Sequence, residues 1–110
     1  MTTASSAARV AWLAQTLRDD SLPAWESLDA SAQERLAADA DIAIHGGSGG
    51  EYFDQWRAAR GDDGWSYGAA LDFAAKTSPM IVEPSTLTDE QRSRITLWHA
   101  VCRAYWRSLL

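Results

Sequence analysis

The segment from Thr88 to the C-terminus constrains the fold more than any other part of this chain. Its first four residues, Thr-Asp-Glu-Gln, match a capping box, in which the first and fourth side chains bond the free amides of a helix start. Apolar residues then recur at spacings of three and four, which lines one side of a helix with an apolar stripe: Ile95, Trp98, Cys102, Tyr105 and Leu109. This pattern predicts one long amphipathic helix, against which the rest of the chain packs.

Two more helices are predicted in the N-terminal half. Apolar residues at helical spacing indicate a first helix over residues 6–19, after a disordered leader over residues 1–5. Ser31 opens a second capping box, and the helix that follows is expected to reach His45. The apolar residues that mark these helices are Val10, Leu13, Ala14 and Leu17 in the first, and Leu36, Ala40, Ala43 and Ile44 in the second.

A third helix and a short ribbon are predicted in the middle of the chain. Ser48 opens a third capping box, and this helix is expected to end at Arg60, where a glycine follows. Residues 69–76 are expected to form a further helical turn or two, and the segments near Trp65 and Ile81 a two-strand ribbon. The predicted fold is therefore mainly α: a small helical domain of about four helices with a short two-strand ribbon.

The size and charge of the chain limit what it can bind. At 110 residues it has room for one domain with one modest core, which we place over residues 6–110. A formal net charge of −5 argues against a nucleic-acid duplex or an anionic membrane as the principal partner. The single cysteine, Cys102, fits a reducing compartment. No apolar run approaches membrane-spanning length and no signal peptide is recognisable, so we expect a soluble, cytoplasmic protein.

Aromatic and charged residues are concentrated between residues 52 and 79. If the segment after the Gly61–Gly64 turn is extended, alternation places Trp65 and Tyr67 on the same side. Aromatic rings in a glycine-rich loop are typical of a binding surface on a rigid scaffold, although aromatic residues in a small protein more often form its core. The predicted ligand-binding residues are Trp56, Arg57, Arg60, Trp65, Tyr67, Asp72 and Lys76.

Catalytic and metal-binding patterns do not stand out in the sequence. The two histidines, His45 and His99, are isolated, and Cys102 lies in an apolar helical pattern that favours burial. Asp62 and Asp63 are adjacent residues of a turn, where acidic side chains are common. We therefore expect no enzymatic activity, no metal site and no cofactor.

Several residues of the C-terminal half follow the order of a known repeat: Trp56, Gly64-Trp65-Ser66-Tyr67-Gly68, Asp72, Lys76, Pro79, Leu87 and Glu90-Gln91-Arg92. In this order the chain resembles the ryanodine-receptor repeat domain, and most closely the short single-domain version found in phage and bacterial genomes. The resemblance extends from about Val10 to Tyr105. Ser78 and Phe53 stand where that family often has histidine, and Ile95 stands where it has an aspartate, so any ligand contact made by those histidines is altered here.

The resemblance implies a helical unit with short strands, without catalytic activity, that binds a small and nucleotide-derived ligand. Repeats of this kind occur in tandem pairs in the receptors, so a free single repeat implies a homodimer. For a phage protein the resemblance implies a sensor or sequestering agent for host signalling nucleotides, acting in the host cytoplasm.

Two hypotheses about function follow. In the first, the aromatic rings stack on a base while Arg57, Arg60 or Lys76 pairs with phosphate. In the second, the same exposed aromatic surface is the core of a protein–protein interface, because Trp, Tyr and Arg are also the residues that anchor interfaces. Composition does not separate the two.

Overall fold

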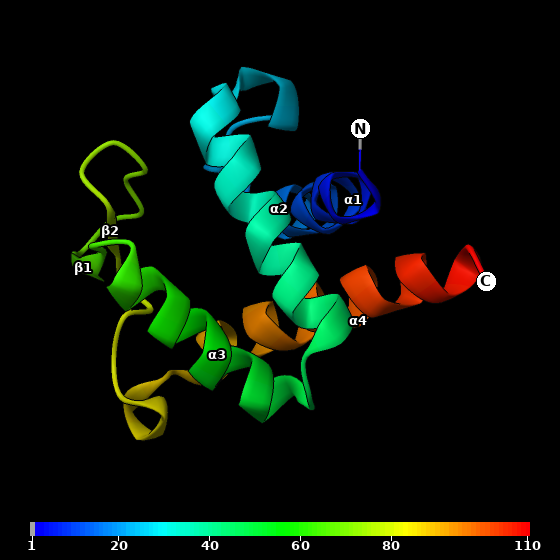
Figure 1. The fold of residues 1–110 in the computed structure, drawn as a ribbon. Coiled ribbons are helices and arrows are strands. Elements are labelled where there is room, and N and C mark those ends of the chain that lie inside the picture. Colours follow the sequence, from blue (N-terminus) through cyan, green and yellow to red (C-terminus); the bar gives the residue numbers. More distant parts are fainter. Residues whose placement is uncertain (1) are drawn as a thin grey trace.

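The computed structural model describes residues 2–110, and within this range four helices pack around one core (Figure 1). Two short strands pair in parallel, with Ser66 opposite Thr77 and Tyr67 opposite Ser78. The predicted mainly α fold of four helices and a two-strand ribbon is confirmed. The elements are α1 (Thr3–Arg18), η1 (Trp25–Ser27), α2 (Ala30–His45), α3 (Gly49–Asp62), β1 (Ser66–Tyr67), β2 (Thr77–Ser78), η2 (Pro84–Thr86) and α4 (Asp89–Ser108).

Helix α1 packs against both α2 and α4, and Figure 1 shows it almost end-on beside them. Its buried face is built mainly from alanine, and small side chains of this kind let helix backbones approach closely. The residues concerned are Ala7, Ala8 and Ala11 on α1, which meet Ala40 and Ala43 of α2 in the same core. Consequently, the larger apolar residues that marked this helix in the sequence, Val10, Leu13 and Leu17, lie on its exposed side.

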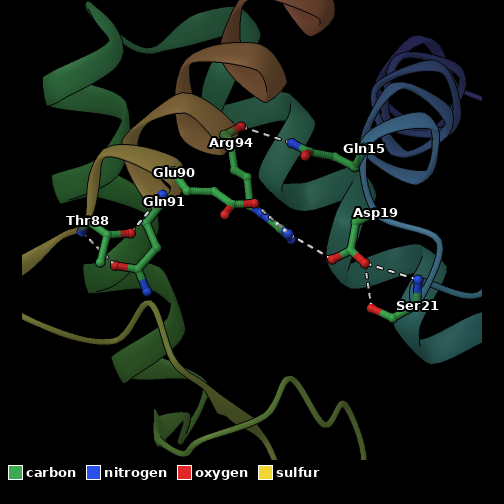
Figure 2. A network of polar contacts seen from close by, with 7 residues as sticks. All are labelled: Gln15, Asp19, Ser21, Thr88, Glu90, Gln91 and Arg94. Carbon is green, nitrogen blue, oxygen red and sulfur yellow. Dashed lines mark hydrogen bonds and ion pairs between the residues drawn. The ribbon is translucent and has the colours of Figure 1, made fainter.

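Polar contacts join the end of α1 to the start of α4 (Figure 2). Arg94 donates from Nη2 to Oδ2 of Asp19 at 2.7 Å, and Gln15 donates to the backbone carbonyl of Arg94 at 2.9 Å. Hydrogen bonds from Ser21, together with Arg94, lower the pKa of Asp19 to about 2. Asp19 therefore stays ionised at neutral pH and holds the two helix ends together.

The capping box at the start of α4 is confirmed, and it gives a testable prediction. Thr88 Oγ1 accepts from the Gln91 amide at 3.1 Å, and Gln91 Oε1 accepts from the Thr88 amide at 2.9 Å. Thr88→Ala is expected to lower the free energy of unfolding by about 1 kcal/mol in urea titration. Ser48→Ala is the matched control, because Ser48 precedes α3 without a side-chain capping bond in the described part of the chain. Equal losses in the two variants would contradict the prediction.

The starts of the first two helices differ from the prediction. Helix α1 begins at Thr3, because the Thr2 side chain accepts from the Ser5 amide at 3.0 Å, so residues 3–5 of the predicted leader are helical. Met1 lies outside the described residues. Helix α2 begins one residue before Ser31, because Asp29 caps it by accepting from a backbone amide at 2.8 Å.

The segment between the strands is a turn and not the predicted helix over residues 69–76. The Asp72 carboxylate accepts from the amides of Ala74 and Ala75, both at 3.0 Å, which replaces helical bonding by a local side-chain bond. The ribbon forms between β1 and β2, and not with the segment near Ile81. Gly68 permits this pairing, because a Cβ atom there would lie 2.6 Å from the Cβ atom of Thr77.

The core is rich in tryptophan. Trp25 is buried in the connector η1, outside the four long helices. The stripe on α4 is buried at Ile95, Trp98 and Cys102 and reaches the surface by Leu109. Among residues 2–110, no helix is long and apolar enough to cross a membrane.

Candidate functional site

Arg60, in the last turn of α3, is the centre of a buried cluster that joins three of the predicted site residues. Its Nη2 atom donates to Oδ2 of Asp39 on α2 at 2.6 Å, and each side chain is only 3% exposed. The guanidinium carbon lies 4.3 Å from the ring centre of Trp65 and 5.2 Å from that of Trp56. Arg60 thus combines a buried ion pair with cation–π contacts to two indole rings.

The end of α3 explains why Trp65 lies over Arg60. The Trp65 amide bonds the carbonyl of Arg60 at 2.9 Å, and the Gly64 amide bonds the carbonyl of Gly61 at 3.1 Å. These two bonds form a Schellman motif, and Gly64 has the positive φ, 85°, that the motif requires. The motif turns the chain back, so that the residue after the glycine packs on the last turn of the helix.

The prediction that Trp65 faces outward is therefore wrong. Its side chain is 6% exposed, whereas that of Tyr67 is 61% exposed. Side chains two residues apart share a side only within a strand, and Trp65 belongs to the helix end while Tyr67 belongs to β1. The indole Nε1 of Trp65 donates to the Asp63 carboxylate at 3.1 Å, which holds the ring in place.

The other predicted residues do not join this cluster. Arg57 is half-buried and donates to the carbonyl of Val82 at 2.9 Å. Lys76 has a left-handed backbone, with φ of 57°, and donates from Nζ to the carbonyl of Asp63 at 2.9 Å. It lines a polar pocket of about 320 Å³ that is separate from the cluster. The structure brings Trp56, Arg60 and Trp65 together and leaves Arg57, Tyr67, Asp72 and Lys76 outside.

A pocket of about 140 Å³ lies beside the Arg60 cluster. Trp56 and Arg60 form part of its wall, and Leu71, at 41% exposure, lies where the pocket meets solvent. All four helices contribute to the remaining wall, which is mostly aromatic and aliphatic. The wall includes Trp12 from α1, Leu36 and Asp39 from α2, Tyr52 and Phe53 from α3, Ser78 from β2, Met80 from the segment after it, and Ile95 and Trp98 from α4.

Several wall residues with polar atoms were not selected from the sequence, among them Asp39, Arg94 and Trp98. Within the described residues, Oδ1 of Asp39, Nε1 of Trp98, and Nε and Nη1 of Arg60 are buried without a hydrogen-bond partner. Most buried polar atoms in proteins have a partner, so these four are exceptions, and because they have almost no accessible surface they lie behind the surface of the pocket. The sequence did indicate that Asp39 would be buried, because Asp39 lies on the same helical face as the apolar residues Leu36 and Ala43.

Burial changes the charge behaviour of the cluster. It raises the pKa of Asp39 from an ordinary 3.8 to about 6, although the positive charge of Arg60 favours the carboxylate. A carboxyl group whose pKa is raised in the folded state stabilises the fold at low pH, and this contribution is lost as pH rises through the folded pKa.

Asp39→Asn removes this titration and provides a test. The free energy of unfolding of the unmodified protein, minus that of the variant, is expected to fall by roughly 2 kcal/mol between about pH 4 and pH 7. Taking the difference between the two proteins cancels the pH dependence that comes from the other carboxyl groups, including Asp19 and Asp63, whose pKa values are lowered. Urea titrations at several pH values measure it, and a difference that does not vary with pH would contradict the pKa assignment.

His99 and Cys102 lie in structural positions. His99 bonds the carbonyl of Gly47 through Nε2 at 3.0 Å. Cys102 is fully buried, as predicted, and burial raises its pKa to about 12. Within the described residues, His, Cys, Asp and Glu side chains form no group of three that would hold a metal ion.

Comparisons with known proteins found no matching family model, no matching curated protein and no matching solved structure. The resemblance to the ryanodine-receptor repeat therefore stays a prediction. Function has to be argued from the pocket and its cluster.

Proposed function

We propose that this protein is a non-enzymatic module that binds a small, nucleotide-derived molecule and senses or sequesters it. The observation that carries the proposal is the aromatic-walled pocket beside the Arg60 cluster. Ligand sites in proteins are typically concave and mostly apolar, with a few polar groups, and this pocket has both features. It also contains two residues, Trp56 and Arg60, that sequence reasoning selected for ligand binding.

The volume of the pocket limits which part of a ligand enters it. An engineered cavity of about 150 Å³ in another protein binds benzene, so about 140 Å³ suits one ring. For a nucleotide-derived ligand, the base would enter the pocket while the sugar and phosphate stay at the surface. Each charged residue of the wall already has a partner: Asp39 and Arg60 pair with each other, and Arg94 pairs with Asp19. This arrangement suits the binding of a ligand and not catalysis.

The sequence resemblance supplies the biological part of the proposal. It suggests a phage or bacterial protein that acts on a nucleotide signal in antiviral conflict, in the cytoplasm and as a homodimer. These features rest on the resemblance alone.

A thermal-shift panel of nucleobases, nucleosides and mono-, di- and cyclic nucleotides tests the proposal. At least one compound is expected to raise Tm, by about 5 °C at ten times its Kd. Leu71→Trp, which places a larger side chain where the pocket meets solvent, is expected to abolish the shift. Leu13→Trp is the matched control, since Leu13 is exposed on α1 away from the pocket. The proposal fails if no compound shifts Tm.

One observation favours a second candidate, a protein–protein interaction module. Val10, Leu13 and Leu17 recur at helical spacing on the exposed side of α1 and form an apolar stripe. This stripe, and not the aromatic cluster, would be the contact surface. Light scattering after size-exclusion chromatography tests the candidate: Leu13→Gln would convert a homodimer to a monomer, and a chain that is monomeric without substitution would exclude self-association through α1.

A further inference from the structure

We propose that residues 66–77 form a lid on the pocket, and that Lys76 latches this lid to the end of α3. The lid comprises β1, the loop after it and the first residue of β2. It swings outward as one unit to admit a ligand and then closes over it. This inference rests on the proposed function and adds how a ligand enters the pocket.

Two side chains of the lid form part of the pocket wall. Leu71 and Phe73 both line the pocket, and the Phe73 ring meets the ring of Trp65 edge-on, with 5.7 Å between the ring centres. None of residues 66–77 is buried, whereas the residues on either side, Trp65 and Ser78, are only 6% and 4% exposed. The lid therefore joins the fixed part of the molecule at these two buried residues.

Hydrogen bonds within the lid make it one unit. The amides of Asp72 and Thr77 each donate to the carbonyl of the other, at 3.0 and 3.1 Å, and the Ser66 amide donates to the carbonyl of Lys76 at 3.0 Å. Thr77 Oγ1 donates to the carbonyl of Ala70 at 3.1 Å. By contrast, the two strands pack only lightly on the helices, and in Figure 1 the loop between them stands clear of all four helices. A segment that is bonded to itself and has few buried contacts opens at a low cost in free energy.

The side chain of Lys76 joins the lid to the end of α3. Its Nζ atom donates to the carbonyl of Asp63 at 2.9 Å and lies 3.6 Å from Oδ1 of the same residue. Within residues 2–110, Lys76 is also the only non-glycine residue with a positive φ, 57°. A residue with a Cβ atom enters this left-handed region at a cost and stays there where contacts hold it. The contacts to Asp63 thus hold the lid in its closed position.

Lys76→Gln removes the latch and provides the test, with toluene as a probe whose single apolar ring suits the size of the pocket. In NMR exchange measurements, the rates of toluene binding and dissociation are both expected to rise about fivefold, the usual effect of losing one hydrogen bond. The Kd should not change, because the latch is the same in the free and the bound protein. Arg35→Gln is the matched control, since Arg35 also contacts Asp63, at 3.2 Å, but lies on α2 outside the lid.

The outcomes separate the lid from the proposed function. If Lys76→Gln leaves both rates unchanged, or raises the dissociation rate alone, the lid inference is wrong and the proposed function stands. If toluene does not bind while a nucleotide of the panel raises Tm, that nucleotide replaces toluene in the same rate measurement. If neither toluene nor any compound of the panel binds, both are wrong.

NMR relaxation dispersion of the free protein measures the motion of the lid itself. The backbone amides of residues 66–77 are expected to share one exchange process, and Lys76→Gln should raise the population of its minor state about fivefold. Arg35→Gln should leave this population unchanged. Exchange that is absent from residues 66–77 in Lys76→Gln, or that involves the helices equally, would overturn the proposal.

Discussion

Arg60→Ala is expected to lower the free energy of unfolding by about 3–5 kcal/mol, the range found when one partner of a buried ion pair is removed. The loss is large because Asp39 loses its buried counter-ion, and at neutral pH it must then either protonate or keep an uncompensated charge. The variant also loses the guanidinium between the rings of Trp56 and Trp65. For a small protein whose total stability is typically about 5–15 kcal/mol, this is a substantial fraction. Urea titration followed by circular dichroism measures it.

Two further variants separate charge from packing in this experiment. Arg57→Ala removes the neighbouring arginine of α3, which is half-buried and paired with Glu83 at 3.4 Å, so its cost should stay within about 1 kcal/mol. The double variant Asp39→Leu with Arg60→Met replaces both charges by apolar side chains, and it should be more stable than Arg60→Met alone. If the double variant is the less stable of the two, the unpaired Asp39 carboxyl group costs little, and the account of an uncompensated charge is wrong.

The helices that the sequence predicts well are those with both a start signal and a clear apolar face. Helix α4 has its capping box at Thr88 and buries Ile95 and Trp98, and α2 buries the face that was predicted for it. Local signals of this kind act within one turn of helix, and of the three predicted capping boxes only that at Thr88 forms in the described residues; Ser48 makes no side-chain capping bond. The Ser31 box failed because Asp29, two residues earlier, offers an equally good cap.

The buried side of α1 could not be predicted from the sequence of that helix alone. Hydrophobicity alone favours Val10, Leu13 and Leu17 as the buried face, yet the fold buries Ala7, Ala8 and Ala11. The alanines are buried because α2 and α4 pack closely against α1 and leave room only for small side chains. How closely they pack depends on the complete fold.

Sequence reasoning located the candidate site only in part. It selected Trp56, Arg60 and Trp65 for their residue types, and the structure gathers these three. It placed Trp65 outward because strand alternation was applied to a residue that belongs to a helix end. The other site residues were missed because they come from other helices. Asp39, the partner of Arg60, lies on α2, and only the complete fold brings the two side chains together.

Trp65→Ala gives the second large expected effect, a loss of about 3–5 kcal/mol, the range for removing a buried aromatic side chain. The indole covers Arg60, meets the ring of Phe73 edge-on at 5.7 Å and donates to Asp63, so its removal opens a cavity and exposes the buried ion pair. Tyr67→Ala is the matched control, because Tyr67 is largely exposed and should cost no more than about 0.5 kcal/mol. Urea titration of both variants decides between a structural Trp65 and the outward-facing pair expected from the sequence. Similar small losses would favour the outward-facing pair, whereas a loss confined to Trp65 means that this ring is structural and supports Arg60, a residue of the pocket wall, from outside the wall itself.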